Sequence, residues 1–229
     1  MLAFLQNYTD MGFFSVILFV LIGTVLTMIV QASAATMAIT LIMCANGWIS
    51  FELGAALVLG ENIGTTITAN IAASVGNTQA KRAAMSHTIF NLFGVIWALI
   101  LFEPFLGLVG MIIELFGLPN PTVEGFVVSS PTSDEGTSVL YGLSMLHTLF
   151  NTINTFILIW FVKAIEKAVV AIIKAPKEQD ADAFRLKYIS AGPLSTPELA
   201  TEEAFNEIIH FANISRKGLG YAKLAIAEK

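Results

Sequence analysis

Two polar clusters interrupt an apolar stretch of the sequence between residues 30 and 70. The first is the run QASAAT at residues 31–36, and the second is GENIGTT at residues 60–66, followed by Thr68 and Asn70. No Lys, Arg, Asp, Glu or His lies between Asp10 and Glu52, as is typical of membrane-embedded segments. In hydrocarbon, an unpaired amide or hydroxyl group costs several kcal/mol. These groups therefore need partners, which can be each other, opened backbone or a polar cargo held at the midplane of a transporter.

Close packing of helices is the alternative interpretation of the hydroxyls and small residues, because Ser, Thr and Gly often bring membrane helices together. The acid and the amides favour a site instead, since ionisable groups inside a membrane are functional candidates. Residues 53–59 are too short to span, so Gly60 and Gly64 predict two half-helices around an opened polar turn. Half-helix N-termini suit an anion such as phosphate, and Glu61 with opened carbonyls suits Na⁺ or H⁺.

The composition predicts a membrane protein with a short charged tail. Of the 229 residues, 55% are hydrophobic and only 13% are charged, whereas a soluble domain has about 25% charged residues. Residues 1–175 carry five Lys or Arg and nine Asp or Glu, whereas residues 176–229 carry seven and eight. We therefore expect an all-α membrane domain at 1–175 and a cytoplasmic helical tail at 176–229. The net charge of −5 without a basic run argues against a nucleic-acid partner. Cys44 is alone, which excludes a disulfide framework.

Hydropathy and charge predict the topology of the membrane part. Apolar runs long enough to span lie at 12–30, 86–102 and 139–162. Residues 33–49 either span as well or form the returning arm of a hairpin that turns at 31–35. Cytoplasmic flanks collect Lys and Arg, so we expect 79–85 and 163–229 to be cytoplasmic. The 103–138 segment has five acids and no Lys or Arg, and is expected on the outer (extracellular or periplasmic) side of the cell (inner) membrane.

A short motif occurs twice in the chain. His87-Thr88 precedes Phe90-Asn91, and His147-Thr148 precedes Phe150-Asn151, sixty residues later. His and Asn at positions i and i+4 share one face of a helix, so each face is predicted to turn inward. The two His–Asn pairs either hold the bundle together by hydrogen bonds between helices or take part in ion coupling.

The C-terminal part of the chain predicts two further helices. Residues 163–175 are amphipathic and end before Pro176, as expected of a helix at the cytoplasmic surface. Ser195-Thr196-Pro197-Glu198 has the features of a helix start. Beyond it, apolar and small residues at a 3–4 spacing predict a one-sided stripe without a partner in the chain. The stripe consists of Phe205, Ile208, Ala212, Ser215, Leu219, Ala222 and Ile226. Either more helices follow it in a longer protein, or it pairs with another copy.

At these residues the chain resembles the bacterial branch of the type II sodium/phosphate cotransporter family. Its members carry a Gln-Ser-Ser-Ser-Ala-Thr motif and a Gly-x-Asn-Ile-Gly-Thr-Thr motif in each of two inverted repeats. The second motif is intact at residues 60–66, and residues 81–91 also resemble the second repeat. Ala32 and Ala34 replace two of the three serines of the first motif. The tail resembles the junction to a cytoplasmic PhoU-like domain, which is cut short here.

The resemblance implies that this chain is the second repeat of such a transporter, with half of a site built across the repeat interface. The residues that it implies for phosphate are Gln31, Ser33, Asn62, Thr65 and Thr66. Those assigned to sodium are Thr36, Glu61, Thr68 and Asn70. Those assigned to structure or coupling are His87, Asn91, His147 and Asn151. The expected partners are inorganic phosphate, Na⁺ as coupling ion, membrane lipid, and the missing first repeat or a second copy; no other cofactor is expected.

Two functions of different classes follow from these features. The first is sodium-coupled phosphate symport by alternating access across paired repeats. The second is a membrane scaffold that does not transport, whose tail recruits a cytoplasmic phosphate-signalling partner. An enzyme is not expected, because the sequence has no Gly-x-Ser-x-Gly elbow and no metal-spaced cluster.

Overall fold

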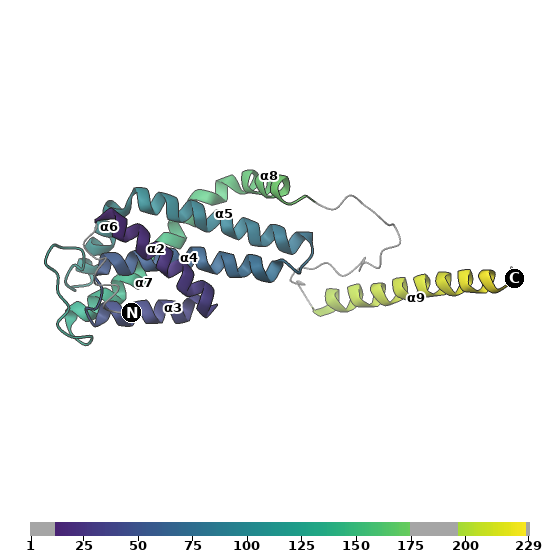
Figure 1. Cartoon of the computed structure of the whole chain (residues 1–229), viewed down its shortest axis with the longest axis horizontal. Coiled ribbons are helices and arrows are strands. Elements are labelled where there is room, and N and C mark those ends of the chain that lie inside the picture. The colour runs from purple at the N-terminus through teal and green to yellow at the C-terminus, as the bar shows by residue number, and fades with distance from the viewer. Residues whose placement is uncertain (1–11, 175–196, 228–229) are drawn as a thin grey trace. The chain divides into compact units, whose positions relative to one another are not determined.

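The computed structural model describes residues 12–174 and 197–227, and these residues form helices and the segments that join them, with no strand among them (Figure 1). The all-α prediction is therefore confirmed. The chain divides into two compact units, Met1–Ala175 and Pro176–Lys229. The helices of the first unit are α2 (Phe13–Val30), α3 (Ser33–Ala45), α4 (Phe51–Ala73), α5 (Thr78–Ile100), α6 (Phe102–Leu115), α7 (Asp134–Leu158), the short 3₁₀ helix η1 (Ile159–Phe161) and α8 (Val162–Ile172). The second unit contributes α9 (Pro197–Ala227).

Side-chain caps explain where three of the long helices begin. The Ser50 hydroxyl accepts a hydrogen bond from the Leu53 N–H at the start of α4. The Asn77 side chain accepts one from Ala80 N–H at the start of α5. Ser133 does the same for α7, whose first turn carries two acids that suit the positive end of a helix dipole.

Helices α2 and α4 form the centre of the first unit, and they run in the same direction. Gly23 of α2 lies against the Leu57 carbonyl of α4, and Thr27 of α2 lies against Gly64 of α4. A methyl group added at Gly64 would come within 2.6 Å of the Thr24 carbonyl oxygen, so only a glycine fits there. The small residues therefore bring two helix backbones into contact, as expected in a membrane protein.

Helix α3 is the returning arm of a hairpin, which decides between the two alternatives for residues 33–49. The chain reverses at Gln31, whose backbone is left-handed (φ 57°) and whose N–H donates to the Thr27 carbonyl. Helix α3 then runs antiparallel to α4, because Thr40 meets Glu61 while Cys44 lies against Gly54. With 13 residues, α3 is about 20 Å long and too short to cross about 30 Å of hydrocarbon.

The prediction of two half-helices around Gly60 and Gly64 is wrong. Helix α4 is continuous over 23 residues from Phe51 to Ala73, through the whole GENIGTT motif. The two glycines serve the contact with α2 instead of opening the backbone. Helix α6, at the start of the 103–138 segment, was not predicted from the sequence. Its buried face includes Phe105 and Val109.

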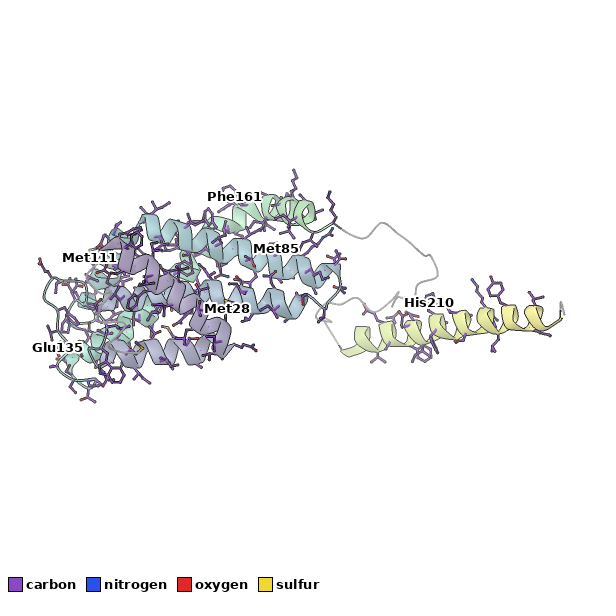
Figure 2. All side chains as sticks on the ribbon, viewed as in Figure 1. Met28, Met85, Met111, Glu135, Phe161 and His210 are labelled. Atoms are coloured by element: carbon purple, nitrogen blue, oxygen red, sulfur yellow. The ribbon has the colours of Figure 1, made fainter. Side chains whose placement is uncertain are left out.

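Helices α5, α7 and α8 complete the first unit. Asn154 of α7 is fully buried and joins α7 to α5, because its side chain donates to the Phe90 carbonyl (2.9 Å) and accepts from the Trp97 indole (3.2 Å). Helix α8 packs on α5 (Figure 1). The Arg82 guanidinium of α5 donates to the Ile173 carbonyl just beyond the last turn of α8. Met85 of α5 and Glu135 at the start of α7 lie toward opposite ends of this unit (Figure 2).

Two of the helices, α2 and α5, are long and apolar enough to cross a membrane. Many apolar side chains of the first unit are exposed, including Phe14, Ile29, Ile100 and Trp160. Such a surface fits a lipid environment, in which apolar side chains need no cover.

The second unit is the helix α9 over its described residues. It begins at Pro197, as predicted, and the residues expected to cap it lie outside the described ones. Phe205, Ile208 and Leu219 of the predicted stripe are exposed, but so are Phe211 and Ile214 on other faces of the same helix. The apolar side chains are thus not confined to one side, in contrast to the one-sided stripe expected from the 3–4 spacing.

Candidate functional site

A cavity of about 490 Å³ lies among α3, α4, α5 and α7 in the first unit. Most of its polar lining consists of residues that the sequence singled out. These are Ser33 of α3, Glu61, Asn62 and Thr65 of α4, His87 and Asn91 of α5, and His147 and Asn151 of α7. Residues far apart in sequence thus meet in one place.

The two copies of the His–Asn motif line the same cavity from α5 and α7. In each copy, the Asn side chain donates to the backbone carbonyl of its own His, at 3.1 Å for Asn91 and 2.9 Å for Asn151. Neither imidazole has a hydrogen-bond partner among residues 12–174 and 197–227. The alternative in which these histidines hold the bundle together by hydrogen bonds between helices therefore finds no support in this part of the chain.

Each amide of the cavity has a side-chain oxygen that accepts no hydrogen bond within the described residues. The Asn62 side-chain NH₂ donates to the Val58 carbonyl at 2.8 Å, as Asn91 and Asn151 do one helical turn back along their own helices. The Thr65 hydroxyl likewise donates to the Glu61 carbonyl at 2.9 Å. Each amide therefore keeps its carbonyl oxygen for another partner. Oxygen atoms of this kind bind cations.

Glu61 is the one acidic side chain in the lining of this cavity. It is buried, with 4% of its surface exposed, and the Thr40 hydroxyl of α3 donates to its Oε1 at 2.7 Å. That is its one hydrogen bond to a side chain in the described part of the chain. No Lys or Arg lines the cavity, so the carboxylate has no fixed cation beside it. Thr40 was missed by the sequence analysis, although its position four residues after Thr36 was a usable signal.

The N-terminus of α3 opens on the same cavity at Ser33 and Ala34. No side chain caps this helix, and its first N–H groups have no carbonyl within the helix to bind. The free N–H groups and the helix dipole make this edge of the cavity favourable for an anion.

Five predicted residues lie outside the cavity. Gln31 is exposed at the hairpin turn. Thr36 is buried between the Ala32 carbonyl and the Thr27 hydroxyl. The hydroxyls of Thr66 and Thr68 bind carbonyls of their own helix, at Ile63 and Thr65. Asn70 binds the Thr88 hydroxyl of α5 at 2.6 Å. Thr36, Thr68 and Asn70 therefore do not line the cavity with Glu61, and the side chain of each is engaged in other hydrogen bonds.

The fold and cavity together define a helical membrane protein with a polar site between its helices. The family model described as "Na+/Pi-cotransporter" matches residues 2–120, which include α2, α3, α4, α5 and α6. The chain belongs to the Na⁺/Pi-cotransporter family. No solved structure matches it.

Curated relatives agree with this family. The "Putative inorganic phosphate export protein YjbB" of Escherichia coli K12 is 27% identical over 198 residues, which are 86% of this chain and 32% of that protein. YqeW of Bacillus subtilis is 44% identical over 86 residues, 38% of this chain and 27% of that protein. The rat "Sodium-dependent phosphate transport protein 2B" is 40% identical over 81 residues, 34% of this chain and 12% of that protein. The chain thus spans about a third of the length of YjbB and less of the other two.

Proposed function

We propose that the chain is one repeat of a transporter that moves inorganic phosphate across the cell membrane together with Na⁺. The observation that carries the proposal is the cavity in which Glu61, the free amide oxygens and the N-terminus of α3 meet. The family match and the printed names of YjbB and the rat transport protein support phosphate as the cargo.

The charge of Glu61 supplies the reason for coupling. Two unit charges about 4 Å apart repel each other by about 4 kcal/mol at the effective dielectric constant of a partly buried site. Glu61 is buried without a Lys or Arg in the cavity lining. In its ionised form it therefore repels a phosphate anion unless a cation accompanies the anion. A Na⁺ ion held by the Glu61 carboxylate and the amide oxygens would remove this repulsion, so that each ion favours binding of the other.

A second repeat is needed to complete the site. His147 is exposed on α7, and Ser33 and Ala34 are exposed at the start of α3, although all three line the cavity. In a bilayer, polar groups on an exposed face require a protein or water neighbour. We infer that another repeat covers this side, from the remainder of a longer protein or from a second copy of this chain. Alternating access then follows from rocking of one repeat against the other.

The arrangement of charges supports the proposed topology. Lys81 and Arg82 lie in the first turns of α5, and Arg82 binds the chain beside the end of α8. Glu103 follows the opposite end of α5, about 30 Å away along a helix of this length. With the Lys- and Arg-rich end in the cytoplasm, segments 79–85 and 163–229 are cytoplasmic and 103–138 lies outside.

Phosphate binding with and without Na⁺ tests the proposal. The full chain, co-expressed with a first repeat, is reconstituted in proteoliposomes. Binding of ³²P-phosphate and its uptake are both measured with and without Na⁺. Wild-type protein is expected to take up phosphate only with Na⁺. Glu61→Gln keeps the shape of the side chain but removes its charge, so phosphate binding is expected to persist without Na⁺ while Na⁺-driven accumulation is lost. The matched control Glu114→Gln, on exposed α6 surface outside the cavity, is expected to behave as wild type. A Glu61→Gln variant that still requires Na⁺ would refute the role of this carboxylate.

The scaffold function is a second candidate, favoured by the exposed apolar side chains of α9. A pull-down with the full chain discriminates between the two. A scaffold keeps its cytoplasmic partner when Glu61 and Asn62 are changed, and loses it when Phe205 is changed to Asp. A transporter loses uptake with the first pair of changes.

A further inference from the structure

A second cavity, of about 680 Å³, lies between α5 and α8 at the Lys- and Arg-rich end of the first unit. Its two walls differ in character. Helix α5 contributes polar side chains, namely Gln79, Arg82, Ser86 and His87. Helix α8 contributes mainly apolar side chains such as Ile165 and Val169, together with one acid, Glu166. None of the residues predicted to bind Na⁺ or phosphate lines this second cavity.

Arg82 gives this cavity a fixed cation with free donors. Its Nε–H donates to the Ile173 carbonyl at 3.1 Å, which holds the guanidinium in place. The guanidinium makes no other hydrogen bond and no ion pair within residues 12–174 and 197–227. Its two terminal NH₂ groups are therefore left to bind a ligand, and a planar fork of this kind matches the oxygens of a phosphate group.

The two cavities share part of one wall. His87 and Phe90, one turn apart on α5, line both the central cavity and the cavity between α5 and α8. These two side chains therefore separate the central cavity from the space beside Arg82. An ion could pass from one cavity to the other only if both side chains moved aside.

We infer that the cavity between α5 and α8 binds a phosphate group, held by the free NH₂ groups of Arg82 with Gln79 and His87 beside it. The role of this cavity in phosphate transport rests on the proposed function, but phosphate binding in the cavity can be tested by itself. Two sources share this chemistry: inorganic phosphate that has passed His87 and Phe90, and the phosphate of a lipid headgroup whose acyl chains cover the apolar wall of α8.

Glu166 allows a test in which one substitution lowers the affinity for phosphate and another raises it. Its carboxylate lines the same cavity as Arg82 and repels an anion bound there. Removing Arg82 is expected to weaken phosphate binding, and removing the charge of Glu166 is expected to strengthen it. Mere loosening of α8 from α5 cannot produce the second effect.

Protection of a cysteine from maleimide measures binding in this cavity directly. Cys44 is the one cysteine of the sequence and is buried, so a Cys44→Ala background allows a single reporter thiol. Ser86→Cys reports on the cavity between α5 and α8, and Ala38→Cys reports on the central cavity alone. The full chain is placed in nanodiscs of phosphatidylcholine with added inorganic phosphate, or in nanodiscs that contain phosphatidylglycerol without it.

Phosphate at twice its dissociation constant is expected to slow labelling of Ser86→Cys about threefold. Arg82→Gln is expected to raise the dissociation constant for phosphate about tenfold, because charged hydrogen bonds to the anion are lost, so that the same phosphate concentration slows labelling only about 1.2-fold. Glu166→Gln is expected to lower the dissociation constant about threefold, so that the slowing rises to about sevenfold. Protection by added phosphate assigns the site to the free ion, and protection by phosphatidylglycerol alone assigns it to a lipid headgroup.

Protection of Ser86→Cys in neither type of nanodisc would overturn the inference, as would protection that Arg82→Gln leaves unchanged. The central reporter separates this result from the proposed function. If phosphate protects Ala38→Cys but does not protect Ser86→Cys, the proposed central site stands and the second site is refuted. If phosphate protects Ser86→Cys but does not protect Ala38→Cys, the central site is refuted and phosphate binding between α5 and α8 stands.

Discussion

Gly64→Ala tests whether the glycines of the GENIGTT motif serve the contact between α2 and α4. The added methyl group would lie 2.6 Å from the Thr24 carbonyl oxygen and 2.7 Å from Thr27 Cβ, both on α2. Ordinary contact begins at 3.4 Å, so the two helices must separate by about 0.8 Å, which forfeits a quarter to a half of each dispersion contact along the seam.

The same separation breaks a hydrogen bond. The Thr24 hydroxyl lies 3.0 Å from the Gly60 carbonyl, and a further 0.8 Å, about the displacement above, takes this pair beyond hydrogen-bond distance. Overpacking costs about 1–3 kcal/mol and the lost hydrogen bond about 1 kcal/mol, while Ala in place of Gly in a helix returns about 0.5–1 kcal/mol. We expect Gly64→Ala to lower the free energy of unfolding by about 1–3 kcal/mol.

Equilibrium unfolding of the full chain in mixed micelles, followed by circular dichroism, measures this free energy. Gly107→Ala on α6 is the matched control, because an added methyl group there meets nothing within 4 Å. It is expected to leave stability unchanged or raise it by about 0.5–1 kcal/mol. If Gly64→Ala is as stable as Gly107→Ala, the close contact of the glycines does not stabilise the packing of α2 against α4.

The other predictions concern buried polar groups, including Glu61. Asn154→Ala leaves the Trp97 indole N–H and the Phe90 carbonyl without their partner, and is expected to cost about 2–5 kcal/mol in a thermal or denaturant titration. Ser138→Ala removes the hydroxyl that binds the Pro119 carbonyl at the start of α7, and is expected to cost about 1–2 kcal/mol in the same titration. Glu61→Gln is expected to change these unfolding free energies little, while it removes the Na⁺ dependence of phosphate binding measured in proteoliposomes.

Asn46→Ala is the control for the Asn154 variant. The Asn46 side chain is exposed and binds only a carbonyl of its own helix, at Ile42, so its removal is expected to change stability by less than about 0.5 kcal/mol. Equal losses for both Asn variants would contradict the assignment of the Asn154 hydrogen bonds as the link between α5 and α7.

Sequence reasoning located most helices of the first unit and most of the cavity residues, because apolar runs and the spacing of polar residues can be read from the sequence alone. Apolar runs of about 20 residues marked α2 and α5, and His and Asn at i and i+4 marked the faces of α5 and α7 that line the cavity. The continuity of α4 was not predictable in the same way. A glycine pair beside an acid is compatible both with a broken helix and with a close helix contact, and Gly60 and Gly64 make the second.

The sequence also does not determine which individual threonine hydroxyls face the cavity and could bind sodium or phosphate. Thr65 and Thr66 are neighbours in the motif, yet one lines the cavity and the other is fully buried against its own helix. A helix turns by about 100° per residue, so adjacent side chains face different surroundings. Thr40, which lies outside both motifs, contacts Glu61 because α3 folds back along α4.

The backbone at Gln31 has a consequence for the hairpin. A residue with a Cβ atom in the left-handed region costs about 1–2 kcal/mol, which glycine would not. The chain therefore keeps a long amide side chain at a position where its own backbone favours the smallest residue. Strain of this kind persists where the side chain has a task, and the exposed amide of Gln31 points to one outside this unit. Under the proposed function, this exposed amide lies where the tip of the hairpin would contact a second repeat.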